Sequence, residues 1–192
     1  MIKENKEAQI IIDPQSSLNS AMLNEKQLAL RKAELTKVTT NFTKSLSQNA
    51  LSARNGLVSL VFNQLFEVPN FSWAHHANLC IALGDIRTRD GLLRKLHDEI
   101  GLRAQVCEHL AREVARAEKP WVAPLATVLG GIVWLAGFPE QTRVAIDRAL
   151  DCDPSYSLAL LLDIALRHNV PASVWSASLE AVSFEACLKG AA

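Results

Sequence analysis

Apolar residues recur along most of this chain at spacings of three and four residues, which is the period of an amphipathic helix. The pattern is first clear over residues 20–37 and again from Leu46 to Phe66. The polar pair Thr39-Thr40 separates the two stretches, and Pro69 follows the second one. The sequence therefore predicts two N-terminal helices with a break near the threonines.

Capping and turn residues mark the helices that follow. Ser72 is predicted to cap a helix that ends at Gly84, because its hydroxyl can accept from amides that have no partner within the helix. Two further amphipathic helices are predicted over residues 87–96 and 102–117. Pro120 is expected as the first residue of the next helix, where a missing amide costs nothing.

The segment from Ala126 to Pro154 has part of the spacing of a tetratricopeptide motif. Gly130 would allow two helices to approach closely, and Gly137 would end the first helix in a left-handed cap. Ala149 would pack where no larger side chain fits. Asp153-Pro154 is predicted to begin a third helix, as its N-cap and first residue, which covers the hairpin.

Three positions depart from the tetratricopeptide pattern, because Ala126, Val133 and Thr142 replace its tryptophan, tyrosine and first alanine. A groove for a peptide also requires several stacked repeats. The match therefore predicts a helical hairpin that packs into the core, and no peptide groove.

These patterns predict an all-α fold, an irregular bundle of about eight or nine helices with the tetratricopeptide-like hairpin at its C-terminal end. Residues 1–18 are expected to be a loose N-terminal segment in which Ile10-Ile11-Ile12 forms an extended piece at most. Residues 19–185 are expected to form a single helical domain. Its predicted parts are N-terminal helices over 19–68, middle helices over 72–118, and the hairpin with capping helices over 120–182.

The charge balance argues against nucleic acid as a partner. The chain has 20 basic and 20 acidic residues, so its net charge is zero. A local excess of basic residues from Lys26 to Arg54, where Glu34 is the single acid, is interpreted as a solvated helix face. The four cysteines are widely spaced and the first residues lack a secretion signal, so free thiols and a cytoplasmic location are expected.

Residues 121–138 are uncharged over eighteen positions, which is the lower limit for a membrane span. Pro124 and Gly130 weaken this stretch as a helix, and the hairpin offers Val144 and Ile146 as packing partners. A buried core helix is therefore preferred to membrane association.

Few residues suggest catalysis or metal binding. His75 and His76 are adjacent and would point about 100° apart on a helix, so they are interpreted as surface or half-buried side chains. His109 and Glu113 could share a helix face, but two ligands do not make a metal site, so they are interpreted as a surface pair that slightly stabilises the helix. The turn His97-Asp98-Glu99 is expected to be solvated. No catalytic residue, metal site or cofactor is predicted, and no phosphate-binding or nucleophile motif occurs.

The most promising polar cluster consists of Asp85, Arg87, Arg89 and Asp90. Opposite charges at a helix junction can form an internal ion-pair network, or they can bind an anionic ligand. Structural pairing is the preferred interpretation. If the chain binds a ligand, Arg87 and Arg89 are the residues predicted to hold it.

The stretch WLAGFPEQTRVAIDRALDCDPSYSLALLL from Trp134 to Leu162 resembles the C-terminal signature of an uncharacterised actinobacterial family, number 4192 among the domains of unknown function. LGDIRTRDGLL from Leu83 to Leu93 and VPASVW from Val170 to Trp175 agree with it, so the resemblance spans about residues 75 to 180. It implies a shortened member without the α/β N-terminal portion of longer members. The family has no established catalytic residues to carry over.

Together these observations favour a noncatalytic protein that acts by protein–protein interaction or as a scaffold, with a protein partner or a second copy of itself. The alternative is a small domain that binds an anionic ligand through Arg87 and Arg89. Membrane association through residues 121–138 is the third and least favoured hypothesis.

Overall fold

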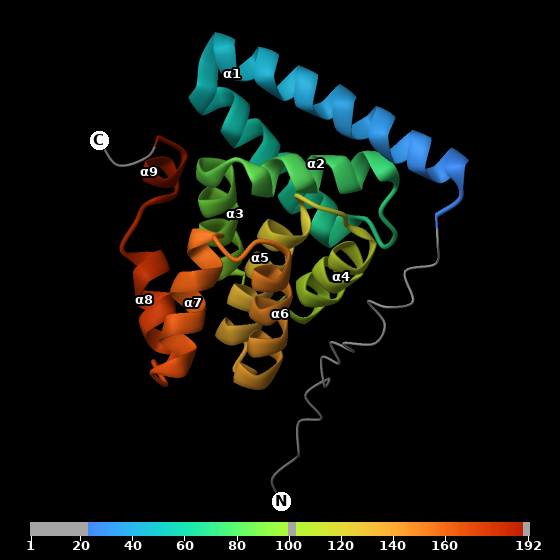
Figure 1. Cartoon of the computed structure of the whole chain (residues 1–192). Coiled ribbons are helices and arrows are strands. Elements are labelled where there is room, and N and C mark those ends of the chain that lie inside the picture. Colours follow the sequence, from blue (N-terminus) through green and yellow to red (C-terminus); the bar gives the residue numbers. More distant parts are fainter. Residues whose placement is uncertain (1–22, 100–102, 190–192) are drawn as a thin grey trace, which may run out of the picture.

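The computed structural model describes residues 23–99 and 103–189, which form nine helices and no strand (Figure 1). This confirms the predicted all-α fold. The loose segment expected at residues 1–18 lies outside the described residues. The helices are α1 Glu25–Glu67, α2 Trp73–Gly84, α3 Ile86–Asp98, α4 Arg103–Arg116, α5 Val122–Leu135, α6 Pro139–Cys152, α7 Ser157–Arg167, α8 Ala172–Glu180 and α9 Phe184–Lys189.

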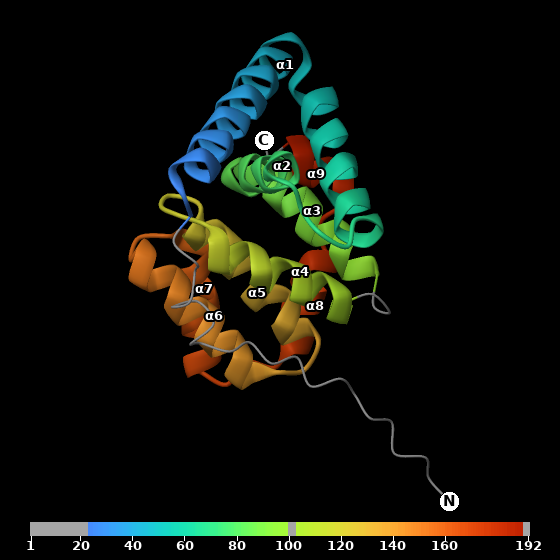
Figure 2. The ribbon, with the colours of Figure 1, turned by 90° about the vertical axis from the view of Figure 1, so that its right-hand side faces the viewer.

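Helix α1 bends sharply at Asn49, whose φ of −156° and ψ of 97° lie outside the helical region. The side chain of Asn49 accepts a hydrogen bond of 3.0 Å from the backbone N–H of Ser52, as an N-cap residue does. The bend divides α1 into an arm, residues 25–48, and a second limb, residues 50–67. Figure 2 shows the two limbs as an inverted V with α2 between them.

The break predicted at Thr39-Thr40 is wrong, because the helix continues for nine more residues to the bend at Asn49. The hydroxyl groups of Thr39 and Thr40 donate to the carbonyl groups of Leu35 and Thr36 at 2.7 and 2.8 Å. These bonds within the helix satisfy the polar side chains without interrupting it.

Helix α5 lies at the centre of the bundle and contacts six other helices, α2, α3, α4, α6, α7 and α8. Every residue from Val122 to Trp134 is buried. The uncharged stretch 121–138 is therefore a core helix and the turn that follows it, as preferred from the sequence. None of the described helices has both the length and the apolar character needed to cross a membrane.

Helices α5 and α6 form the predicted hairpin, and its small residues have the predicted roles. Gly137, in the turn, has a φ of +89°, which only glycine adopts without strain. A Cβ at Gly130 would lie 2.9 Å from Cδ1 and 3.2 Å from Cγ1 of Ile146, so a larger residue would require the buried Ile146 side chain to shift. Ala149 is fully buried.

Two predicted helix starts are wrong by two or three residues. Pro120 lies in the turn before α5, which begins at Val122. Pro154 likewise lies in a turn, and α7 begins at Ser157. Asp153 caps this turn and not the helix, since its carboxylate accepts from the N–H and hydroxyl of Ser155 at 3.0 and 2.7 Å.

Candidate functional site

Of the four residues predicted as a site, Asp85 is turned away from the others and has a structural role. Its carboxylate accepts hydrogen bonds from the N–H and hydroxyl of Thr88, which makes it the N-cap of α3. It also accepts from Nε of Arg54 on α1 at 3.1 Å. Partial burial alone would raise the pKa of Asp85, but the bonds from Thr88 and Arg54 outweigh it and lower the pKa.

Arg89 and Asp90 form an ion pair that neutralises both charges. Nε and Nη2 of Arg89 donate to Oδ1 of Asp90 at 2.9 and 2.7 Å, and Nη1 donates to the hydroxyl of Tyr156 at 2.9 Å. The Arg89 side chain is 7% exposed and that of Asp90 is 42% exposed. Burial alone would lower the pKa of Arg89, but Tyr156 and Asp90 raise it, so the guanidinium stays charged.

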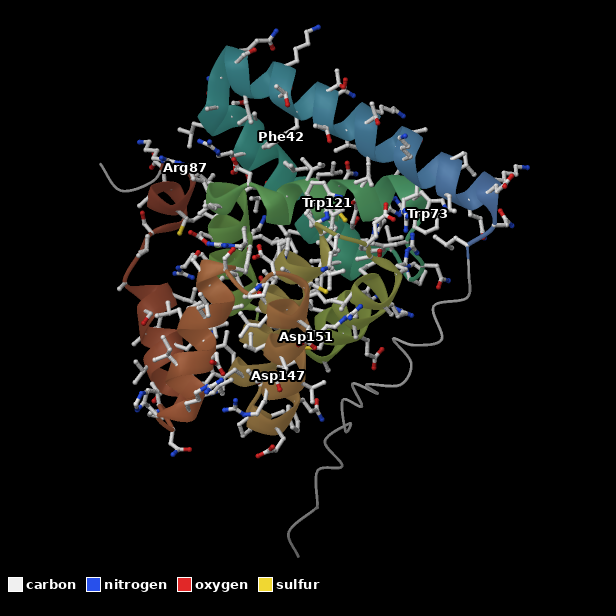
Figure 3. All side chains as sticks on the ribbon, in the orientation of Figure 1. Phe42, Trp73, Arg87, Trp121, Asp147 and Asp151 are labelled. Carbon is white, nitrogen blue, oxygen red and sulfur yellow. The ribbon has the colours of Figure 1, made fainter. Side chains whose placement is uncertain are left out.

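Arg87 differs from Arg89 because its guanidinium has no hydrogen-bond or ion-pair partner among the described residues. It lies beside α9 at the edge of the molecule, near the start of α3 (Figure 3). Arg87 is half-buried and lines a pocket together with Arg89 and Asp90. The structure therefore brings three of the four predicted residues together.

This pocket, which we call the Arg87 pocket, has a volume of about 440 Å³. Its polar wall is the first turns of α3. Its other walls come from α7, α8 and α9 and from the link between the last two, and they are largely apolar. Their main side chains are Leu158, Trp175, Leu179 and Val182. The indole N–H of Trp175 donates to the carbonyl of Gly131 at 3.2 Å, which fixes the ring in the pocket wall.

A second polar group, which we call the His76 cluster, consists of His76, Cys80 and Glu113 between α2 and α4. Nδ1 of His76 lies 2.6 Å from Oε2 of Glu113, and Nε2 lies 3.4 Å from Sγ of Cys80. All three residues are at least 97% buried. Cys80 contacts His76, and His76 contacts Glu113. A catalytic site can use such a thiol, imidazole and carboxylate as nucleophile, base and orienting acid.

The chemistry of Cys80 argues against such a role. Burial raises the pKa of its thiol, and the neighbouring carboxylate of Glu113 raises it further. The thiol therefore remains protonated, whereas a nucleophilic cysteine needs a stabilised thiolate. Arg116 lies beside the cluster. Its Nε is 3.4 Å from Oε2 of Glu113, and its guanidinium carbon is 4.1 Å from the centre of the Trp73 ring. The cluster is a closed structural network.

Three interpretations of histidines from the sequence need correction. His76 is neither a surface nor a half-buried residue, and His109 and Glu113 are buried rather than a surface pair. His97 is not in a solvated turn, since it is 7% exposed and its Nε2 lies 2.8 Å from the hydroxyl of Ser176 on α8. The i, i+4 spacing revealed the shared face of His109 and Glu113, but no local signal reveals a contact between His76 and Glu113, 37 positions apart.

Two arginines of the basic run on α1 form ion pairs with residues outside this helix. Arg31 is buried and pairs with Glu118, and Arg54 pairs with Asp85. The lysines of the arm are exposed, and Lys37 pairs with Glu34 on the same face. The lysines therefore form a solvated helix face, as the sequence predicted. The two arginines do not, because they pair with residues of other segments.

Comparison with known proteins places the chain in a family without assigning it an activity. No group of three or more His, Cys, Asp or Glu side chains in residues 23–99 and 103–189 could hold a metal ion. No curated protein and no solved structure matches the chain. One family matches residues 4–173, which extends the resemblance seen in the sequence toward the N-terminus over all of α1 and the start of α2. The chain therefore belongs to the family described as Domain of unknown function (DUF4192).

Proposed function

We propose that this chain is a noncatalytic helical protein that acts through protein contacts, and that its contact surface is the outward face of α7. The observation that supports this is an exposed apolar stripe of Leu160, Leu161 and Ile164, which are 39%, 58% and 55% exposed. These residues follow helical spacing, so they form one continuous face. We call this face the α7 stripe.

The neighbouring helices explain why the stripe has no cover. The hairpin of α5 and α6 packs against α7, as in a helical array in which each unit covers the one before it. The next helix of such an array would pack on the outer side of α7. Helix α8 instead packs against α3 and α5, so the α7 stripe keeps its exposure.

The occupant we propose for this face is a second copy of the chain. A stripe of aliphatic side chains is complementary to itself when two copies meet about a two-fold axis, which is the commonest symmetry of protein assemblies. A net charge of zero removes the repulsion that would oppose self-association. The four cysteines are free thiols, which fits assembly by packing, in the cytoplasm, without disulfide links.

Light scattering after size exclusion, over a range of protein concentrations, tests this proposal. We expect the full chain to approach twice the mass of one chain as the concentration rises. Leu161→Asp should remain at the mass of one chain, because a carboxylate cannot be desolvated in an apolar interface. Leu161 is exposed, so the variant should keep the circular dichroism spectrum of the unaltered protein.

Leu30→Asp is the matched control, since Leu30 is 49% exposed and lies on α1, away from the stripe. We expect it to associate like the unaltered chain. A chain that stays monomeric at every concentration would overturn the proposal of a second copy, and equal loss of association in both variants would overturn the assignment to α7.

A further inference from the structure

The Arg87 pocket joins a single uncompensated positive charge to an extended apolar wall. The charges of Arg89 and Asp90 cancel within their ion pair, which leaves the guanidinium of Arg87 as the net charge of the lining. The remaining walls present Leu158, Trp175 and Leu179. A complementary ligand therefore has one anionic group at one end and an apolar body.

The same charges exclude several ligand classes. A nucleotide or a polyphosphate carries several negative charges, and the Asp90 carboxylate in the wall would repel them. One free guanidinium also could not balance them. A cation would be repelled by Arg87 and would compete with Arg89 for Asp90. A single carboxylate can pair with Arg87 through two hydrogen bonds, which is the geometry that arginine favours.

The dimensions limit the length of the apolar body. The pocket volume of about 440 Å³ is within the range of small-molecule sites. Since a water molecule occupies about 30 Å³ in the liquid, the pocket suits a ligand of roughly a dozen non-hydrogen atoms. A straight-chain carboxylate of medium length has this size and shape.

We propose that the Arg87 pocket binds a medium-chain monocarboxylate, with its carboxylate on Arg87 and its alkyl chain against Leu158, Trp175 and Leu179. This binding site is separate from the α7 stripe and does not depend on it. Arg89 and Asp90 are positioning residues in this arrangement, because they shape the polar wall while their own charges cancel.

Isothermal titration calorimetry of the full chain with decanoate, below the concentration at which it forms micelles, tests the proposal. We expect saturable binding of one decanoate per chain. Decanol shares the chain but lacks the charge, and it should bind at least about tenfold more weakly. Inorganic phosphate, which has charge but no chain, should give no heat of binding.

Variants locate the site. Arg87→Gln should weaken decanoate binding about tenfold while leaving the fold intact, since the side chain has no partner in residues 23–99 and 103–189. Ser178→Phe should block binding by placing a ring in the pocket from the exposed face of α8. Arg112→Gln is the matched control, because Arg112 is exposed on α4 and does not line the pocket.

A local readout separates binding in the pocket from binding elsewhere. The indole N–H of Trp175 should shift in a two-dimensional NMR spectrum as decanoate is added, and Trp175→Phe identifies its signal. Equal affinity for decanol and decanoate would overturn the proposal, as would an Arg87→Gln variant that binds as well as the unaltered chain. Leu161→Asp should retain decanoate binding, so failure of the self-association proposal is distinguishable from failure of this one.

Discussion

The His76 cluster and the Arg87 pocket each hold charged side chains inside the helical bundle, but they differ in what surrounds those charges. In the cluster, His76 and Glu113 are 1% and 3% exposed and bond to one another. In the pocket, Arg89 is buried, but its partner Asp90 is 42% exposed and Arg87 has no partner among the residues that the structure describes. The cluster is closed and its three side chains contact one another, whereas the pocket is open and keeps one charge available.

This difference teaches that a perturbed or buried polar group is not by itself a sign of function. The His76 cluster has the residue types of a catalytic site, yet its thiol is held protonated and its three residues are almost fully buried. The Arg87 pocket has ordinary residue types, but it has space and an unpaired charge. Available volume and unpaired charge distinguish the two better than residue identity.

The largest effect is expected from Glu113→Ala in the closed cluster. The change leaves His76 buried without its partner and removes the carboxylate beside Arg116. We expect the free energy of unfolding to fall by about 3 kcal/mol, measured by guanidinium denaturation. Glu108→Ala is the control, because Glu108 is exposed on the same helix and should change stability by less than about 0.5 kcal/mol. Similar losses in both variants would contradict the structural role of the cluster.

A smaller effect is expected from Arg89→Met in the open pocket. The side chain loses three hydrogen bonds, but Asp90 is exposed enough to regain water in place of its partner. We expect a loss of about 2 kcal/mol in the same denaturation experiment. Arg87→Met should change stability by less than about 0.5 kcal/mol, since the guanidinium bonds to none of the described residues. If Arg89→Met cost more than Glu113→Ala, the distinction between closed and open sites would be wrong.

The two regions also differ in how much of each could be predicted from the sequence. The candidate ligand-binding residues are close together in the chain, so local spacing was enough to predict them: Asp85, Arg87, Arg89 and Asp90. Helix caps and small residues are equally local, and Ser72 and Gly137 were placed correctly for that reason. The Arg87 pocket could not be predicted fully, because Trp175 reaches it only through the packing of α8 on α3 and α5.

Contacts between distant segments account for the errors. The buried pair of His76 and Glu113 depends on the packing of α2 and α4 in the bundle, which periodicity does not reveal. The bend in α1 was predicted at Thr39-Thr40 because threonine has a low helix propensity. Packing of the arm on α2 and hydroxyl bonds within the helix outweigh that preference, and the bend occurs at Asn49.

Tyr156→Phe gives a finer test of the open pocket. The change removes the hydroxyl that accepts from Nη1 of Arg89 and keeps the ring, whose centre lies 5.8 Å from the guanidinium carbon. We expect a loss of about 1 kcal/mol in the free energy of unfolding, because one N–H of Arg89 loses its partner next to a pocket that admits water. A loss as large as that of Arg89→Met would mean that Tyr156, rather than Asp90, provides most of the pairing.

The smallest effect is expected at Asp85, which is outside both sites and tests whether its charge is structural. Its pKa in the folded protein is below the ordinary value of 3.8. The stability that it contributes is therefore complete above that value and is lost as the pH falls through the folded-state pKa. Asp85→Asn keeps a capping side chain but loses the charge that pairs with Arg54.

We expect Asp85→Asn to be less stable than the unaltered chain by under about 1 kcal/mol near pH 7, and the difference to shrink as the pH falls below 3.8 and through the folded-state pKa. Denaturation curves at a series of pH values measure this. Arg54→Gln should remove part of the same pH dependence, because it removes one of the two groups that lower the pKa of Asp85. A stability difference that stays constant with pH would show that the carboxylate acts only as a neutral cap.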